Sequence, residues 1–371
     1  MKIITRYTLL ILLILPHGGT FARNKEKSYD VIVYGGTSAG VIAAYTAKQL
    51  GKSVILIEPG SRVGGLTTGG LGYTDIGNKY AIKGLSLDFY RKIGQQYGGF
   101  EQWVFEPHVA ENILLAYLKK ANVEVWYQHR IVSAKKSNGK ISSIVVEESD
   151  HPSPGTNKIV SAKMFIDCSY EGDLMAKAGV SYTVGREDNK QYHETYNGVQ
   201  LRDKHQFPDG IDPYKIRGKP ESGLIWGVSS NSLLPDGTGN KMVQSYNIRV
   251  CLTKDTANMI PISRPDDYQP ERYELLLRLM AKKPIKSITD FMTVSQMPNN
   301  KTDINNNGPF STDMIGMSWN YPEGSYTEGE AIFKAHENYT KGLFYFVGHD
   351  PRVPLNIRNE KSIKVSFRVV T

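Results

Sequence analysis

Two hydrophobic periods follow one another near the start of the chain. Residues 29–34 (YDVIVY) and 53–58 (SVILIE) are short apolar runs that predict buried strands. Between them, residues 38–50 place apolar side chains at the spacing of one helix face, and Gly51 ends the pattern. Strand, helix and strand in this order predict a βαβ unit with parallel strands.

The apolar pattern continues to about residue 185. Residues 107–128 predict a helix and then a strand, residues 130–148 predict a hairpin that turns at Asn138-Gly139, and residues 161–169 predict another apolar strand. The fold class predicted is therefore α/β, with a Rossmann-type domain that has a parallel sheet, a βαβ start and an antiparallel excursion.

The composition changes from about residue 186, where Gly, Pro, Asn, Asp and aromatic residues become frequent. Residues 223–230 and 245–253 predict short strands, and residues 270–283 predict one strong helix. We expect a second, mixed α+β domain here, inserted into the first as a cap.

The first residues predict a secretory signal peptide. Lys2 and Arg6 precede the apolar run 9–15, and a small-residue exit follows at 20–22. The run is about half of the roughly 20 residues that span a bilayer, so we predict no stable membrane span and a periplasmic or secreted protein.

The overall composition is that of a globular protein, with 40% hydrophobic and 22% charged residues among 371. The formal charge of +8 is spread along the chain without a basic run, so we predict no nucleic-acid partner. Cys168 and Cys251 are too few for a disulfide framework. Two buried free thiols and a single bridge between them both remain open.

The first predicted turn has the sequence Gly35-Gly36-Thr37-Ser38-Ala39-Gly40. It occupies the place of G-x-G-x-x-G, where the first glycine permits a tight turn, the last lets helix and strand approach, and the helix N-terminus faces a pyrophosphate. Glu58 follows Gly35 by 23 residues, at the end of the second strand, where a carboxylate can bind ribose hydroxyls. This acid disfavours a 2′-phosphate, which leaves NAD and FAD.

The segment after Glu58 favours FAD. Arg62 and the pair Gly64-Gly65 follow at once, and Gly69-Gly70 come next. This arrangement resembles the flavoprotein pattern in which a second glycine pair lies against FAD.

On these residues and several longer segments, the chain resembles the secreted FAD-dependent oxidoreductases of Bacteroidetes-type bacteria, some of which are labelled xanthan lyase. The segments include VYGGTSAGVIAA, RVGGLTTGGLGYTD, FEPHVAENIL, MPNNKTDINNNG and HENYTKGLFYF. The family segment FIDATGDGDL corresponds to residues 165–174, in which Asp167, Gly172 and Asp173 match and residues 168–171 depart, with Tyr170 and Glu171 near the expected phosphates.

The resemblance covers residues 30–358 and fades afterwards, so we expect a truncated or frameshifted member; a natural short variant is the alternative. The expected domains are a signal peptide at 1–22, an FAD-binding domain at 23–185, an inserted substrate or cap domain at 186–330 and a partial return to the FAD-binding domain at 331–371. The predicted FAD-binding residues are Gly35, Gly36, Thr37, Ser38, Ala39, Gly40, Glu58, Arg62, Gly64, Gly65, Leu66, Thr67, Gly69, Gly70, Ile131, Asp167, Gly172 and Asp173.

Few residues are candidates for a role in catalysis. His108 and His193 are possible bases, since a neutral imidazole can take a proton from a hydroxyl or amine, although a surface role suits each as well. Asn247 and Arg249 alternate on a predicted strand, where they could orient a substrate or pair with carboxylates.

The segment TDINNNG at 302–308 begins like a calcium loop, but Met314 stands where a bidentate glutamate should close the site. We therefore expect an Asx-rich turn and no metal.

These patterns predict an exported FAD-dependent oxidoreductase that oxidises a CH–OH or CH–NH group of a small or saccharide substrate by hydride transfer to the flavin. A polysaccharide lyase and a non-catalytic binding module of the FAD fold remain as alternatives. The oligomeric state stays open.

Overall fold

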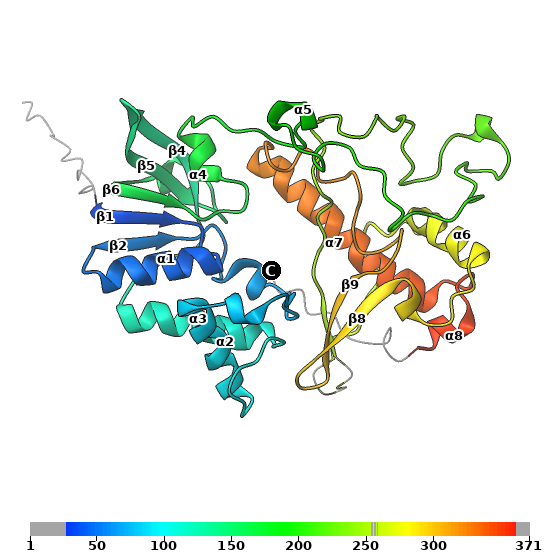
Figure 1. Ribbon diagram of the computed structural model, residues 1–371, viewed down its shortest axis with the longest axis horizontal. Coiled ribbons are helices and arrows are strands. Elements are labelled where there is room, and N and C mark those ends of the chain that lie inside the picture. The colour runs from blue at the N-terminus through cyan, green and yellow to red at the C-terminus, as the bar shows by residue number, and fades with distance from the viewer. Residues whose placement is uncertain (1–26, 254, 256, 258, 361–371) are drawn as a thin grey trace, which may run out of the picture.

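The computed structural model describes residues 27–253, 255, 257 and 259–360. The predicted signal peptide lies outside the described residues. Figure 1 shows two bodies side by side, the first built on a six-stranded sheet and the second around the long helix α7.

The sheet of the first body has the strand order β3-β2-β1-β6-β5-β4. Its strands are β1 (Lys27–Tyr34), β2 (Val54–Ile57), β3 (Glu124–Trp126), β4 (His129–Ser137), β5 (Lys140–Glu148) and β6 (Lys158–Asp167). The strands β3, β2, β1 and β6 pair in parallel, and β5 and β4 extend the sheet in antiparallel pairing. The predicted α/β class is thus confirmed, including the parallel start and the antiparallel excursion.

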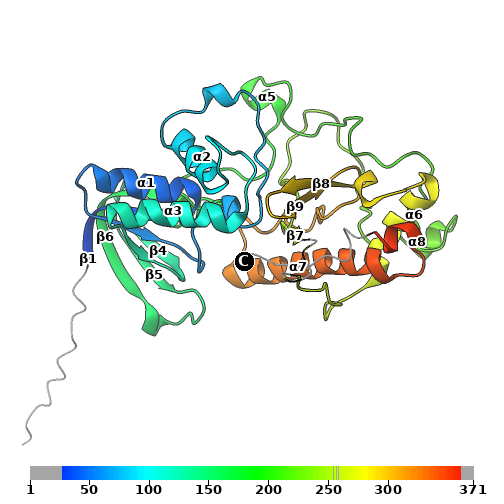
Figure 2. The same cartoon turned by 90° about the horizontal axis from the view of Figure 1, so that it is seen from below.

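Strand β1 is buried on both faces, because Val31 and Val33 point to one side and Ile32 and Tyr34 to the other. The first side packs against α1 (Ser38–Gln49), α2 (Gly84–Gln96) and α3 (Pro107–Ala121), which lie on one face of the sheet in Figure 2. The other side packs in a separate cluster that includes Ile131 of β4.

The second body contains a three-stranded antiparallel sheet with the order β7-β9-β8. Its elements are α5 (Asn189–Tyr192), β7 (Cys251–Thr253), α6 (Glu274–Lys282), β8 (Met292–Met297), β9 (Lys301–Asn306), α7 (Tyr326–His349) and α8 (Leu355–Arg358). The short helix α4 (Asp173–Lys177) precedes it at the end of the first body.

The domain boundary expected at residue 330 falls inside the continuous helix α7, so no boundary is found at that position. Leu343, Phe346 and Val347 on α7 and Ile357 on α8 are fully buried in the core of the second body. From Tyr339 onward, α7 and α8 therefore pack with the second body rather than returning to the first sheet, since their apolar side chains complete its core.

Two local expectations also differ from the structure. Residues 223–230 contain only an isolated bridge from Leu224 to Tyr214 and a turn at 226–227, and of residues 245–253 only β7 is a strand. The expected Asx-rich turn is instead the strand β9, which pairs with both neighbours. Of the two possibilities left open for the cysteines, the structure has the one without a bridge, since no disulfide joins Cys168 and Cys251 and both side chains are partly buried.

The β8–β9 hairpin joins the two bodies at its tip. The buried carboxylate of Glu106, next to the start of α3, accepts a 2.5 Å contact from Lys301 Nζ and a 2.6 Å hydrogen bond from Asn299 Nδ2. Arg249 lies against Gly70, where a Cβ would come within 3.0 Å of the arginine Cβ. These contacts set the second body against the glycine-rich segment of the first.

No helix in the described part of the chain is both long and apolar enough to cross a bilayer. Within the same residues, no three His, Cys, Asp or Glu side chains gather as a metal site would require.

Candidate functional site

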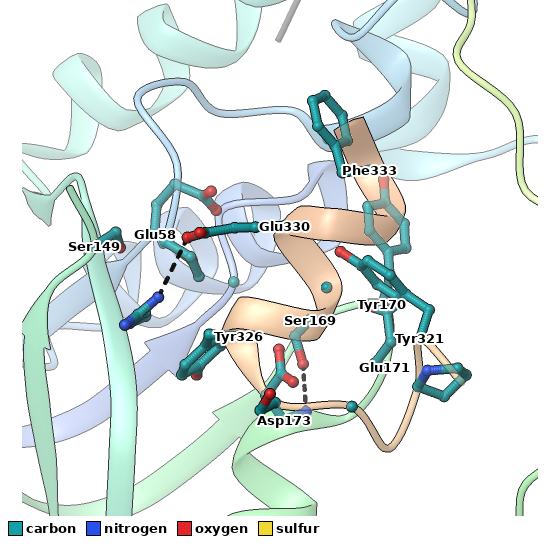
Figure 3. A pocket seen from close by; sticks show the side chains of 18 of the residues that line it. Glu58, Ser149, Ser169, Tyr170, Glu171, Asp173, Tyr321, Tyr326, Glu330 and Phe333 are labelled. Carbon is teal, nitrogen blue, oxygen red and sulfur yellow. Dashed lines mark hydrogen bonds and ion pairs between the residues drawn. The ribbon is translucent and has the colours of Figure 1, made fainter. Parts of the chain in front are cut away.

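A cavity of about 630 Å³ lies at the carboxyl ends of β1, β2 and β6, where parallel α/β sheets bind ligands. Figure 3 shows that side chains of the first body form one wall and that the first turns of α7 form the opposite wall. The lining residues are Gly35, Thr37, Glu58, Pro59, Arg62, Gly65, Arg130, Ser149, Asp150, Ser169, Tyr170, Glu171, Asp173, Tyr321, Pro322, Gly324, Ser325, Tyr326, Gly329, Glu330, Phe333 and Lys334.

The glycine turn brings three chain segments together at the floor of this cavity. Gly35 has φ of 93°, and a Cβ there would lie 2.5 Å from the backbone nitrogen of Ser169. A Cβ on Gly40 would lie 1.9 Å from the carbonyl oxygen of Gly35, so helix α1 can start this close to β1 only without a side chain. Thr37 caps α1, since its hydroxyl accepts from Gly40 N and donates to Cys168 O at 2.9 Å.

Glu58 follows the end of β2 and faces the same turn. Its carboxylate accepts hydrogen bonds from Gly36 N at 2.5 Å and from Gly60 N at 2.7 Å. Burial raises the pKa of Glu58 above its ordinary value, and these two N–H donors oppose that rise. The carboxylate is therefore fixed in direction, with lone pairs left for further donors.

The segment after Glu58 is tied to the start of α1. Gly64 N donates to Gly36 O at 2.7 Å, and the Ser38 hydroxyl lies 3.0 Å from Gly64 O and 2.6 Å from the Thr67 hydroxyl. Gly65 lines the cavity, and Leu66 N donates to the Tyr170 hydroxyl at 2.6 Å. The second glycine pair thus lies beside the first.

The loop after β6 forms the third side of the cavity. Asp167 does not point into the cavity but holds this loop, because its carboxylate accepts from Ser169 N, Ser169 Oγ and Met175 N at 2.6–3.0 Å. Gly172 is left-handed with φ of 71° and starts α4. Tyr170 and Glu171, which depart from the family segment, both line the cavity.

The acidic groups on this side, Glu171 and Asp173, are partly buried. Burial raises the pKa of Glu171, and Asp173 adds to that rise. Burial also raises the pKa of Asp173, with a further contribution from Asp167. The Tyr246 hydroxyl lies 3.4 Å from the carboxylate of Glu171. Both carboxyl groups therefore take up a proton more readily than exposed ones, a property that is common at functional sites.

The residues predicted to bind cofactor divide into three groups. Gly35, Thr37, Glu58, Arg62, Gly65 and Asp173 line the cavity. Gly36, Ser38, Ala39, Gly40, Gly64, Leu66, Thr67, Asp167 and Gly172 shape the turns around it. Gly70 lies against Arg249, Gly69 lies near Gly65, and Ile131 is fully buried.

The catalytic candidates lie outside the cavity lining. His108 is exposed at the start of α3, and His193 is exposed after α5. Arg249 pairs with buried Asp303 through Nη2 at 2.5 and 2.7 Å, and Asn247 donates to Asp313 at 2.6 Å. The pairing with carboxylates, one of the two interpretations open from the sequence, is the one present.

Sequence reasoning missed the side chains that α7 brings to the cavity. Ser325 and Glu328 form a capping box, in which each side chain binds the backbone of the other, and Tyr326 begins the helix. The sequence Ser-x-x-Glu before a long amphipathic run was the signal that could have located this helix. Nothing local, however, indicates that its first turns face Glu58.

The cavity fits FAD in three respects. Its volume falls within the 300–1,000 Å³ common for ligand sites. The N-terminus of α1, bordered by Gly35 and Thr37, offers backbone N–H groups for a pyrophosphate. Glu58 directly follows β2, the position at which a carboxylate binds ribose hydroxyls in folds of this kind.

Comparison with known families gives the class of the protein. Residues 30–361 match the family described as FAD dependent oxidoreductase, which is most of the chain. The chain belongs to this family, and FAD is its cofactor. No curated protein matches the chain significantly.

Several solved structures are similar to parts of the chain. They include the myxobacterial chondrochloren halogenase CndH (14% identity, 38% of this chain and 37% of that one, TM-score 0.31) and a geranylgeranyl bacteriochlorophyll reductase-like protein from Thermoplasma acidophilum (24%, 42% and 43%, 0.31). A 3-ketosteroid dehydrogenase from Rhodococcus jostii is also similar (15%, 39% and 46%, TM-score 0.26). The chain spans less than half the length of each of these proteins.

Proposed function

We propose that this protein is an exported FAD-dependent oxidoreductase that oxidises a CH–OH or CH–NH group of a small or sugar-like substrate. The observation that carries the proposal is the cavity at the carboxyl ends of the parallel strands, where Gly35, Thr37 and Glu58 converge. Export rests on the predicted signal peptide at residues 1–22.

FAD, when bound, supplies the hydride acceptor. The chain's own residues bind and orient it: the first turn of α1 faces the pyrophosphate, and Glu58 accepts from ribose hydroxyls. Gly70 and Arg249 mark the side where the glycine-rich segment meets the second body, and we place the substrate there. Asp303 already neutralises the charge of Arg249. Arg249 therefore acts as a positioning residue that holds this region in place, and it does not bind the charge of a substrate.

The test is the spectrum of the purified chain, followed by anaerobic titration with alcohols, amines and sugars. We expect bound flavin absorbance that bleaches with at least one of these substrates. Cleavage of a polysaccharide to unsaturated products without bleaching would identify a lyase instead. Bound flavin that no such substrate reduces would favour a binding module.

A further inference from the structure

The cavity wall contributed by the second body is one continuous face of α7. Tyr326, Gly329, Glu330 and Phe333 all line the cavity, and their spacing of three and four residues puts them on the same side of the helix. The C-terminal half of α7 is buried in the core of the second body instead. The first turns of this helix therefore serve the cavity rather than the core.

This face is held in place by contacts with β4. The Tyr326 hydroxyl donates to Ile131 O at 2.8 Å, and the Arg130 guanidinium lies 4.2 Å from the centre of the Tyr326 ring. Arg130 is also fixed by Glu147, through a 2.9 Å contact from its Nε. A wall anchored in this way is formed before any ligand binds, which lowers the entropic cost of binding.

The direction of FAD in the cavity follows from the cofactor site proposed above, on which this inference rests. With the pyrophosphate at Gly35 and Thr37 and the ribose at Glu58, the adenine lies beyond Glu58. Figure 3 shows Glu330 pointing from α7 toward Glu58 and Ser149, and Arg130 lies 3.7 Å from Glu330. The α7 face is thus next to the adenosine end.

We propose that the adenine base of FAD packs against the α7 face formed by Gly329, Glu330 and Phe333, and that the Glu330 carboxylate accepts a hydrogen bond from the adenine amine. Gly329 lines the cavity without a side chain, and the Tyr321 ring lies 3.5 Å from the position that a Cβ would take there, so a flat base would lie over the glycine backbone beside Tyr321. Phe333 is 41% exposed and offers an apolar surface to a base.

Glu330 has the chemistry to distinguish adenine from a base with a carbonyl at the same position. An ionised carboxylate only accepts hydrogen bonds, and the adenine amine donates them. Its separation of 3.7 Å from Arg130 is longer than a hydrogen bond, so its lone pairs remain available. Hypoxanthine presents an oxygen at this position, which the carboxylate repels.

The experiment measures binding of ADP, IDP and FAD to the full chain by titration calorimetry. For the wild type we expect ADP to bind about tenfold more tightly than IDP, and Glu330→Ala to bring the two affinities close together. Phe333→Ala should weaken ADP and FAD by about tenfold each through lost stacking. Glu221→Ala and Phe100→Ala change exposed residues of the same types outside the cavity lining and should change nothing.

Thermal unfolding without nucleotide shows whether each variant is folded. A wild type that binds ADP and FAD, with folded Glu330 and Phe333 variants that keep its affinities and its ADP-to-IDP ratio, would overturn the α7 assignment and leave the proposed function standing. A folded wild type that binds neither ADP nor FAD would instead remove the proposed cofactor site.

Discussion

The Tyr326 hydroxyl donates a 2.8 Å hydrogen bond to the carbonyl oxygen of Ile131, joining the first turn of α7 to the central sheet. Ile131 N in turn donates to the Tyr34 hydroxyl at 3.1 Å, and a side-chain hydrogen bond links Tyr34 and Tyr326. Residues far apart in the sequence thus satisfy both backbone groups of one buried strand residue. This network places one wall of the cofactor cavity against the other.

Tyr326→Phe should lower the free energy of unfolding by about 1 kcal/mol, because it removes the hydroxyl that satisfies Ile131 O. Chemical denaturation measures the change. Tyr345→Phe on the same helix is the control, since its ring stacks on His349 and no hydrogen bond of its hydroxyl is found among the described residues. Equal stability of the Tyr326 variant and the wild type would remove this contact from the network.

Glu58→Ala should weaken FAD binding by about ten- to a hundredfold, because the ribose loses a charged acceptor. Flavin content after purification and the Kd for added FAD measure this loss. Glu221→Ala provides a control at an exposed glutamate in the second body. Unchanged flavin content and affinity would take Glu58 out of the site.

Gly40→Val should abolish folding together with flavin binding. Even the Cβ would lie 1.9 Å from Gly35 O, a backbone atom that cannot give way while β1 and α1 keep their positions. Soluble yield and circular dichroism show the outcome. Gly155→Val is the control, because the only atom near its added Cβ is Ser153 Oγ at 3.7 Å; a soluble, flavin-loaded Gly40 variant would contradict this close approach.

Arg249→Met should cost roughly 3 kcal/mol or more of stability, because Asp303, which is 3% exposed, would be left buried without its partner. Asp303→Asn combined with Arg249→Met should recover part of the loss, as a double-mutant cycle would show. Lys163→Met breaks an exposed pair with Asp30 and should have little effect. A loss as small as that of the exposed pair would mean that Arg249 is dispensable for the fold.

His336 should make the protein less stable in mild acid. Burial lowers the pKa of His336 below its ordinary value of 6.5, so the unfolded chain takes up this proton first as the pH falls. The contribution of His336 to the free energy of unfolding is therefore fully present above pH 6.5, and it is lost as the pH falls below that value. Denaturation series at several pH values should show a weaker decline for His336→Gln, and identical declines would exclude His336 as the cause.

The sequence alone determined the first body and the identity of its turn. The alternation in β1 and the spacing in α1 are local, and each residue's position in a strand or helix follows from its neighbours. The roles of Gly35 and Gly40 are also local, because a tight strand-to-helix turn excludes side chains whatever surrounds it. The Asn138-Gly139 hairpin turn was found for the same reason, and its φ angles of 49° and 74° are both positive.

Only the tertiary structure decided which residues meet across the cavity. Glu330 and Phe333 lie about 270 positions from Glu58, and no local pattern encodes such a contact. His108 and His193 were chosen by residue type, and the fold leaves both exposed and outside the cavity lining. The Asn and Asp residues of β9 likewise predicted a turn. The segment is a strand because pairing with β7 and β8 overrides the local preference of these residues.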